Sequence, residues 1–399
     1  MRLVIGSFTA AAALAALSFS PALHAQDFKV FDRTVQAHGF LQQGYAYSNE
    51  NNFLTMDTTS GSFKMTDAGV NLSTSLSDKF RLGAQVYDRN IGILGDYHPQ
   101  LDWAYGDYKI KPWLGFRGGK VKTALGLLND TQDAEFLYTW ALLPQSLYPL
   151  DLRSNTIAHT GGDVYGRIRL QKAGSLSYTG YYGQRANDTR GGEYYGAADI
   201  GDPIASVSGV TGGLDLRWNT PIKGLMLGGS WADLTDTFHA HIVAYGNLPF
   251  KTQTMPEHIT DGYGDYARGR WHFSGEYRNH EDIWKVITPI APPSIVNLGS
   301  KGWFLTAAYR VNNRLEVGTY NSRFYVDVPS IPGSQYNHVF DQAVTGRFDI
   351  DKWWNVKVEG HFMDGTGDPF STHGFYLRDN LKGFKPTTNM LVMRTGFSF

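Results

Sequence analysis

Apolar and polar residues alternate along many stretches of this chain. Residues 354–363 place Trp, Val, Val, Gly and Phe at every second position, with Asn, Lys, Glu, His and Met between them. Residues 80–87, 164–170, 214–219, 303–311 and 391–399 follow the same rhythm. Successive side chains of a β-strand point to opposite faces, so this period predicts strands with one apolar and one polar face.

The alternating runs occur in pairs, and a short polar break separates the two runs of each pair. Tight breaks occur near residues 77–79, 112–113, 171–174, 221–224, 267–270, 312–313 and 351–353, and longer polar loops lie between them. Alternating short and long connections are typical of membrane β-barrels. We therefore predict sixteen antiparallel strands over 37–47, 63–76, 80–90, 101–111, 114–122, 163–170, 175–185, 210–220, 225–237, 257–266, 270–281, 300–311, 314–328, 338–350, 354–365 and 388–399.

The strands are expected to close on themselves. Backbone groups inside a lipid bilayer must all find partners, so an open sheet edge is not allowed there. Sixteen strands close into a barrel wide enough for an aqueous channel. A soluble β-propeller is the rival interpretation, but its sequence blocks should recur, and none do. The predicted fold class is an all-β transmembrane barrel.

The first residues have the order of a secretory signal peptide. Arg2 precedes a nearly continuous apolar and small stretch to Phe19, and Ala25 ends a small-residue cleavage region. We expect residues 1–25 to be removed and residues 26–399 to form a single barrel. The alternative, an N-terminal membrane helix, is disfavoured because the apolar run is short. Later in the chain no apolar run is long enough for a membrane helix.

Composition agrees with an exported barrel. The chain holds 45 Gly, 23 Tyr, 23 Phe and 10 Trp but no Cys, and its formal net charge is −1. A near-neutral charge does not suggest a nucleic-acid partner. Many aromatic and glycine residues with few long apolar runs fit strands that have one lipid-facing and one wet face.

Alternation also assigns charged residues to the interior, because a Lys or Arg in the middle of the lipid face costs about 2–4 kcal/mol. On the predicted interior faces basic residues outnumber acidic ones, and a positive wall concentrates anions. The alternative is that the arginines pair with wall acids and only stiffen the barrel. The basic set is Arg81, Arg117, Arg167, Arg169, Arg217, Arg270, Arg278, Arg310, Arg314, Arg347, Lys357 and Arg394, and the acidic set is Asp102, Asp215, Glu276, Glu316 and Glu359.

The connection over residues 123–162 is long for a plain loop. It carries the acids Asp130, Asp133, Glu135 and Asp151 among apolar residues that a solvated loop would not need. We expect it to fold into the barrel as a constriction loop whose acids face wall arginines. The alternative is a loop that covers the mouth or a subunit contact.

Two sequence features resemble known porins. The terminal stretch from Arg394 to Phe399 ends on an aromatic residue, like the insertion signal of bacterial outer-membrane barrels. Residues 117–127, Arg-Gly-Gly-Lys-Val-Lys-Thr-Ala-Leu-Gly-Leu, resemble the phosphate-selective porin family of Gram-negative outer membranes, and residues 39–45 resemble porin ends more generally. The resemblance implies a trimeric channel of sixteen strands with Lys120 and Lys122 near the constriction. The acidic loop departs from a phosphate channel, so the porin architecture carries over and the phosphate selectivity does not.

These observations predict an outer-membrane porin for passive diffusion of small hydrophilic solutes, mildly preferring anions. The alternatives are a substrate-specific channel for an anionic, phosphate-like or aromatic nutrient, and a non-conducting structural barrel. No enzyme is expected, since no short motif joins a nucleophile to a base. No metal or cofactor is expected either, because His239 and His241 lack a third spaced ligand. The expected partners are lipid, two further copies of the chain and, through Phe399, the barrel-insertion machinery.

Overall fold

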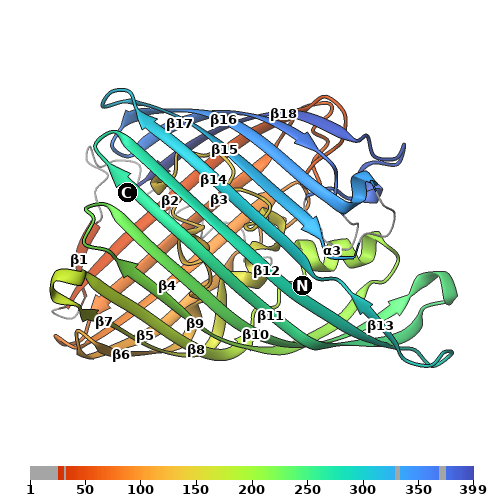
Figure 1. The fold of residues 1–399 in the computed structure, drawn as a ribbon, viewed down its shortest axis with the longest axis horizontal. Coiled ribbons are helices and arrows are strands. Elements are labelled where there is room, and N and C mark those ends of the chain that lie inside the picture. Colours follow the sequence, from red (N-terminus) through yellow and green to blue (C-terminus); the bar gives the residue numbers. More distant parts are fainter. Residues whose placement is uncertain (1–25, 31–32, 329–332, 368–373) are drawn as a thin grey trace, which may run out of the picture.

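The chain forms a closed antiparallel β-barrel of sixteen strands (Figure 1). The computed structural model describes residues 26–30, 33–328, 333–367 and 374–399, so the predicted signal peptide lies outside the described residues. The strands are β2 (Arg33–Ser48), β3 (Ser62–Ser75), β4 (Phe80–Ile91), β5 (Gln100–Lys111), β6 (Leu114–Lys122), β7 (Ala158–Arg169), β8 (Ser175–Arg185), β9 (Ile204–Asn219), β10 (Leu225–Ile242), β11 (Leu248–Arg268), β12 (Trp271–Ile287), β14 (Ser300–Arg310), β15 (Leu315–Val326), β16 (His338–Asp351), β17 (Trp354–Asp364) and β18 (Thr387–Ser398).

Each strand pairs with its neighbours in sequence, and β18 closes the ring on β2. Two short strands add to the ring, since β1 (Gln26–Val30) pairs with β2 and β13 (Ser294–Asn297) pairs with β12. The described helices are α2 (Arg153–Thr156) and α3 (Gly192–Asp199). Neither helix is long and apolar enough to cross a membrane.

Short turns lie at one end of the barrel, here called the turn end, and the opposite end is called the loop end. All seven predicted tight breaks are turns between strands, from residues 76–79 to residues 352–353. Gly224 shows why one such break needs glycine. Its φ is +88°, and a Cβ there would lie 1.9 Å from the carbonyl oxygen of Ala267. The antiparallel barrel and its strand number are therefore as predicted.

The predicted strand ends were wrong near the loop end. Strands β9 to β12 continue five to nine residues further than the sequence indicated, and the β10–β11 connection shrinks to residues 243–247. Pro249 and Pro256 lie in this added part of β11, although proline cannot donate to a ladder. Pro256 occupies a register shift between Thr254 and Glu257, where no ladder bond is required.

The last residue closes the cylinder. The backbone N–H of Phe399 donates to the carbonyl of Gly39 at 3.0 Å, and the Gly39 N–H donates back at 3.1 Å. A Cβ on Gly39 would lie 2.6 Å from the Phe399 ring, so glycine lets the terminal aromatic lie flat against β2. The two ends of the barrel sequence therefore form one continuous wall without an edge.

Alternation separates two surfaces along each strand. On β17, Lys357 and Glu359 are fully buried inside, whereas Val358 and Phe362 expose 45% and 57% of their surface outside. Exposed Leu, Val, Ile, Phe, Tyr and Trp side chains recur on the outward rows of the other strands. An outer apolar band around a sealed wall is the surface that a bilayer requires.

Candidate permeation pathway inside the barrel

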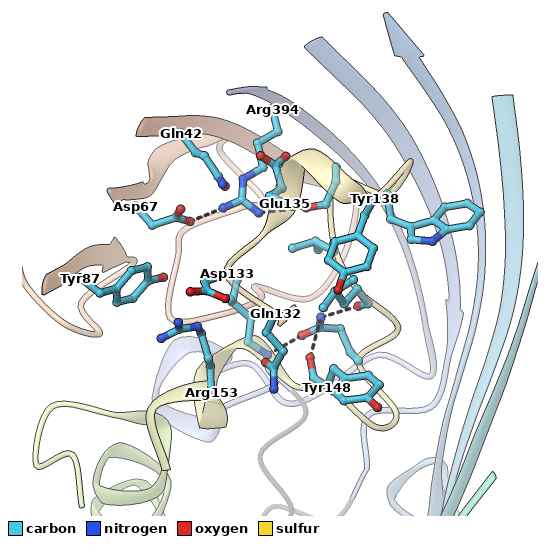
Figure 2. A pocket seen from close by; sticks show the side chains of 16 residues that line it. Gln42, Asp67, Tyr87, Gln132, Asp133, Glu135, Tyr138, Tyr148, Arg153 and Arg394 are labelled. Carbon is cyan, nitrogen blue, oxygen red and sulfur yellow. Dashed lines mark hydrogen bonds and ion pairs between the residues drawn. The ribbon is translucent and has the colours of Figure 1, made fainter. Parts of the chain in front are cut away.

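Residues 123–157, between β6 and β7, fold into the barrel and pack on its wall (Figures 1 and 2). The predicted end of this loop at residue 162 was wrong, because β7 already begins at Ala158. Trp140 meets the wall residue Tyr320 edge to face at 5.4 Å between ring centroids. Leu127, Leu147 and Tyr148 pack against the wall in a second apolar cluster. The apolar residues of the segment thus bury themselves against strands.

Charged wall residues hold the backbone of this inner segment. The Lys357 ammonium on β17 donates to the carbonyl oxygens of Glu135 and Trp140, each at 2.9 Å. The Glu359 carboxylate accepts from the N–H groups of Ala141 and Leu142 at 3.0 and 2.9 Å. These loop groups have no regular secondary structure to satisfy them, so wall charges replace the missing backbone partners.

Strand β12 holds the inner segment in the same way. Glu276 accepts from the Leu127 N–H at 3.2 Å and from the Tyr148 hydroxyl at 2.5 Å. Arg278 donates to the carbonyl of Leu147 at 3.1 Å. The segment is therefore attached to strands on more than one side of the barrel, and its position is fixed by charge-assisted hydrogen bonds.

Three of the four loop acids face wall cations. Asp130 lies 3.3 Å from Arg217, Asp133 lies 2.6 Å from Lys122, and Glu135 lies 2.9 Å from Lys357. Burial alone would raise the pKa of Glu135, but Lys357, Arg394 and Arg347 together outweigh it and hold that pKa below its usual value.

The fourth loop acid does not face a wall arginine, so that expectation was wrong for Asp151. Its carboxylate accepts from the Tyr376 hydroxyl at 2.6 Å and from the Gly374 N–H at 3.2 Å. Both partners belong to the connection between β17 and β18 at the loop end. Burial in this contact raises the pKa of Asp151 to about 6.

Seven of the twelve predicted wall cations lie beside a carboxylate, and for five of them an inward acid that the sequence count left out is a partner. Arg270 and Arg314 lie in turns between strands, so their predicted place on the wall was wrong. Asp67, Asp107, Asp163, Asp261 and Asp349 all lie within ion-pair distance of a wall arginine. A parity count over β3, β5, β7, β11 and β16 would have found them. The paired cations are Arg117 with Asp163 and Asp107, Arg217 with Asp215 and Asp130, Arg278 with Asp261 and Glu276, Arg310 with Glu316 and Asp349, Arg347 with Asp349, and Arg394 with Asp67.

Three of the predicted wall cations that lie on strands, all near the turn end, have no acid partner among the described residues. Arg81 donates to the Ser73 hydroxyl at 2.7 Å, and Arg167 donates to the Ser175 hydroxyl at 2.8 and 3.1 Å. Arg169, two residues further along the same row of β7, is exposed. These three side chains keep their full positive charge toward the lumen.

Lys120 and Lys122, which the porin resemblance placed near the constriction, lie on different sides of the wall. Lys122 reaches Asp133 of the inner segment and is therefore inside. Lys120 pairs in register with Ala104 and Thr160, which belong to the outward rows of β5 and β7. Its ammonium donates to the carbonyl of Leu101 at 2.6 Å. The expected place of Lys120 beside the constriction is thus corrected to the outer face.

Two cavities adjoin the inner segment. One of about 40 Å³ lies among Asp67, Tyr87, Glu135, Arg153 and Arg394 (Figure 2), and it has room for roughly one water. The other, of about 330 Å³, lies toward the turn end between the segment and β5 to β9. Its lining is polar and rich in arginine and tyrosine, and it consists of Lys109, Pro112, Arg117, Ala124, Asp130, Tyr165, Gly166, Arg167, Ser177, Tyr178, Thr179, Asp215 and Arg217.

One group of side chains has the composition of a metal site. In the described part of the chain, Glu257, His280 and Asp282 are the three residues that gather potential ligand atoms. The sequence had singled out His239 and His241 instead. These are alternate residues of β10, and His239 is exposed.

Comparison with known proteins identifies the fold. No known protein family and no curated protein sequence matches the chain. Among solved structures it resembles the outer-membrane OmpT of Vibrio cholerae, with a TM-score of 0.58 and 13% identity over 94% of this chain and 100% of that one. It also resembles OmpF of Salmonella typhi, with a TM-score of 0.56 and 11% identity over 94% and 100% of the two chains.

A third similar structure is an anion-selective porin from Comamonas acidovorans, with a TM-score of 0.52 and 10% identity over 92% and 100% of the two chains. Identities this low establish shared architecture. These three structures do not confirm the phosphate-selective porin family that residues 117–127 suggested. The chain therefore has the closed barrel fold found in outer-membrane porins.

Proposed function

We propose that this protein is an outer-membrane porin, a water-filled channel for passive diffusion of small hydrophilic solutes. The observation that carries the proposal is the placement of residues 123–157. This segment is held against the inner wall by charged side chains, while a polar cavity of about 330 Å³ remains beside β5 to β9. A narrowed but hydrated lumen admits small solutes and excludes large ones. In this role the barrel is a channel and not an enzyme.

The proposed preference for anions is mild. Paired arginines add little net charge to the lumen, because each sits beside a carboxylate. Arg81, Arg167 and Arg169 lie outside such pairs, and Arg167 lines the larger cavity. An uncompensated positive charge in a water-filled passage with low-dielectric walls raises the local concentration of anions. The solved porin from Comamonas acidovorans, described as anion-selective, supports the same direction.

The proposed location is the Gram-negative outer membrane, reached by export with a cleaved signal peptide over residues 1–25. The terminal Phe399 is proposed as the contact for the barrel-insertion machinery. We further propose a homotrimer, in keeping with the trimer form of OmpT from Vibrio cholerae. Migration of unheated, cross-linked protein on a gel tests the assembly, and a monomer alone would contradict it.

Conductance in planar bilayers tests the channel itself. The purified protein should insert in uniform current steps whose size rises with salt concentration, because the lumen is filled with water. Under a salt gradient the reversal potential should have the sign of anion preference. Absence of stable open steps would contradict the channel, and a clear cation preference would contradict the role of the three unpaired arginines.

A substrate-specific channel for an anionic, phosphate-like or aromatic solute is the second candidate. The larger cavity carries both Tyr165 and Tyr178, and the Arg117 guanidinium lies 4.2 Å from the centre of the Tyr165 ring. Such a surface can hold a flat anion by stacking and charge. Block of ion current at low concentration by phosphate or by benzoate would favour this candidate, and unaltered current with both would favour general diffusion.

A further inference from the structure

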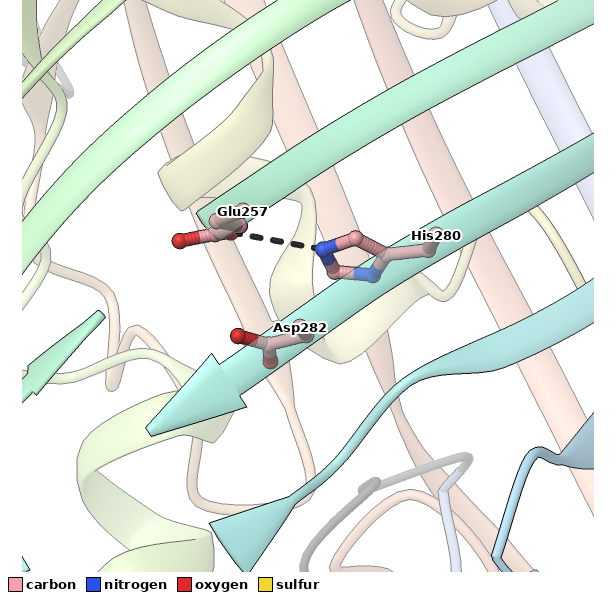
Figure 3. Close-up of side chains that lie close together, drawn as sticks. All are labelled: Glu257, His280 and Asp282. Atoms are coloured by element: carbon pink, nitrogen blue, oxygen red, sulfur yellow. Dashed lines mark hydrogen bonds and ion pairs between the residues drawn. The ribbon is translucent and has the colours of Figure 1, made fainter. Parts of the chain in front are cut away.

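Three potential metal ligands meet inside the barrel toward the loop end. Glu257 on β11 pairs in register with Asp282 on β12, and His280 lies two residues before Asp282. Residues two apart on a strand share a face, so all three side chains belong to the inward surface. Figure 3 shows them gathered around one space. Glu257 and His280 lie within strands that the sequence predicted, and Asp282 follows the predicted end of its strand by one residue.

The geometry suits a single ion. One ligand atom from each residue lies within 4.8 Å of the other two. His280 Nε2 lies 3.3 Å from Glu257 Oε1, which is a long contact for a hydrogen bond. Asp282 Oδ1 accepts no hydrogen bond among the described residues, and the neighbouring polar side chain on its row is that of Trp284. Small inward shifts of the side chains would bring all three donors to about 2 Å from a common centre.

Unpartnered buried oxygens provide an independent observation. Glu257 exposes 7% of its surface and Asp282 exposes 9%, yet Glu257 Oε2 and Asp282 Oδ1 have no hydrogen-bond partner. Buried carboxylate oxygens normally have partners, because their desolvation is costly. Two such oxygens beside one imidazole are a reason to expect a positive ligand.

The charged side chains around Glu257, His280 and Asp282 do not supply the missing positive charge. Asp236 on β10 faces the group and adds negative charge. Arg185 on β8 is already paired with Asp236 at 2.5 Å and with Glu193 at 2.9 Å. Arg278 on β12 is paired with Asp261 and Glu276. With a neutral imidazole the three ligands carry two negative charges, which a divalent cation balances.

We propose that Glu257, His280 and Asp282 bind one divalent transition-metal ion of the zinc class. One imidazole and two carboxylates match the mixed nitrogen and oxygen ligands of Zn²⁺, which leaves a fourth position for water. Calcium would require six to eight oxygen ligands, and this group does not provide them. The ion joins the upper parts of β11 and β12 and stiffens that side of the channel mouth. The proposal is independent of the channel function.

Titration of the whole folded protein tests the site. Detergent-solubilised protein, stripped with EDTA, should bind one equivalent of Zn²⁺ by calorimetry, at least tenfold more tightly than Ca²⁺. Asp282→Asn and His280→Gln should each weaken zinc binding at least tenfold, since each removes one ligand. The double variant His239→Gln/His241→Gln removes two histidines of β10 outside the site and should bind zinc like the unaltered protein.

Heat-induced unfolding gives a second readout with the same variants. Zinc should raise the unfolding temperature of the unaltered protein and of the β10 variant but not that of Asp282→Asn, because an ion that binds only the folded state stabilises it. Failure of the unaltered protein to bind zinc overturns the proposal. So does equal affinity for Ca²⁺, unchanged zinc binding in His280→Gln and Asp282→Asn, or loss of binding in the β10 variant.

Discussion

The ammonium of Lys357 lies 2.9 Å from the carboxylate of Glu135, and the pair joins strand β17 to the inner segment 123–157. The same ammonium also donates to the carbonyls of Glu135 and Trp140. Lys357 has no exposed surface. A single buried cation thus satisfies one acid and two backbone carbonyls of a segment that has few backbone partners of its own.

Lys357→Met should therefore destabilise the protein by about 3–5 kcal/mol, because it leaves the Glu135 carboxylate buried without its cation. Urea unfolding followed by fluorescence measures the loss. The double variant Lys357→Met/Glu135→Gln should recover much of it, since no buried charge is then left alone. Lys79→Met, at an exposed turn, is the control. An equal loss of stability in Lys357→Met and Lys79→Met would contradict the role of the pair.

Asp151 predicts a pH dependence at the loop end. Its pKa is about 6 in the folded protein, above the usual value of about 3.9 in an unfolded chain. The folded form therefore holds the proton more tightly between these values, and the contact of Asp151 with Tyr376 and Gly374 is strongest in acid. It should weaken as the pH rises from about 4 through about 6 and remain constant above that.

Heat-induced unfolding between pH 4.5 and 7.5 measures this dependence. The stabilising contribution of the contact should be largest at the acidic limit and be lost as the pH rises through about 6. Asp151→Asn should keep that contribution at neutral pH, because its neutral amide carries no charge to desolvate. Asp57→Asn, in another connection at the loop end, should behave like the unaltered protein. An unchanged pH dependence in Asp151→Asn would show that another group causes it.

Arg167→Gln should reduce the anion preference. Arg167 faces the larger cavity and bonds only to the Ser175 hydroxyl, so the substitution removes one uncompensated charge. The reversal potential in a salt gradient should move toward zero while the step conductance changes little. Arg314→Gln, at an exposed turn, is the matched control. An unchanged reversal potential in Arg167→Gln would locate the selectivity elsewhere in the lumen.

The two-residue rhythm was sufficient to predict the barrel, since it depends only on the face to which each side chain points. It placed Lys357 and Glu359 inside without knowledge of any contact. The ends of β9 to β12 could not be found in this way, because Pro256 fits a bulge that only the register reveals. The same register brings Glu257 beside Asp282, a meeting that no spacing within either strand indicates.

The sequence count overestimated the positive charge of the inner wall, because it left out several inward acids. Asp67 and Asp163 lie on inward rows of β3 and β7, but the sequence count did not include them. Their pairing with Arg394 and Arg117 depends on which strands are neighbours around the ring. Sequence alternation predicts the face of a residue, whereas ion pairs across strands require the closed topology.

The central claim is that one row of each strand lines water and the next row faces lipid. Because the chain contains no cysteine, a single introduced thiol is the sole target for a charged thiol reagent. Arg167 and Ile168 are adjacent on β7 and belong to opposite rows. The most direct measurement is the current through Arg167→Cys and Ile168→Cys channels while a negatively charged, water-soluble methanethiosulfonate is added. The account predicts a stepwise change in current for Arg167→Cys and none for Ile168→Cys, and an equal response of both channels, or of Ile168→Cys alone, would contradict it.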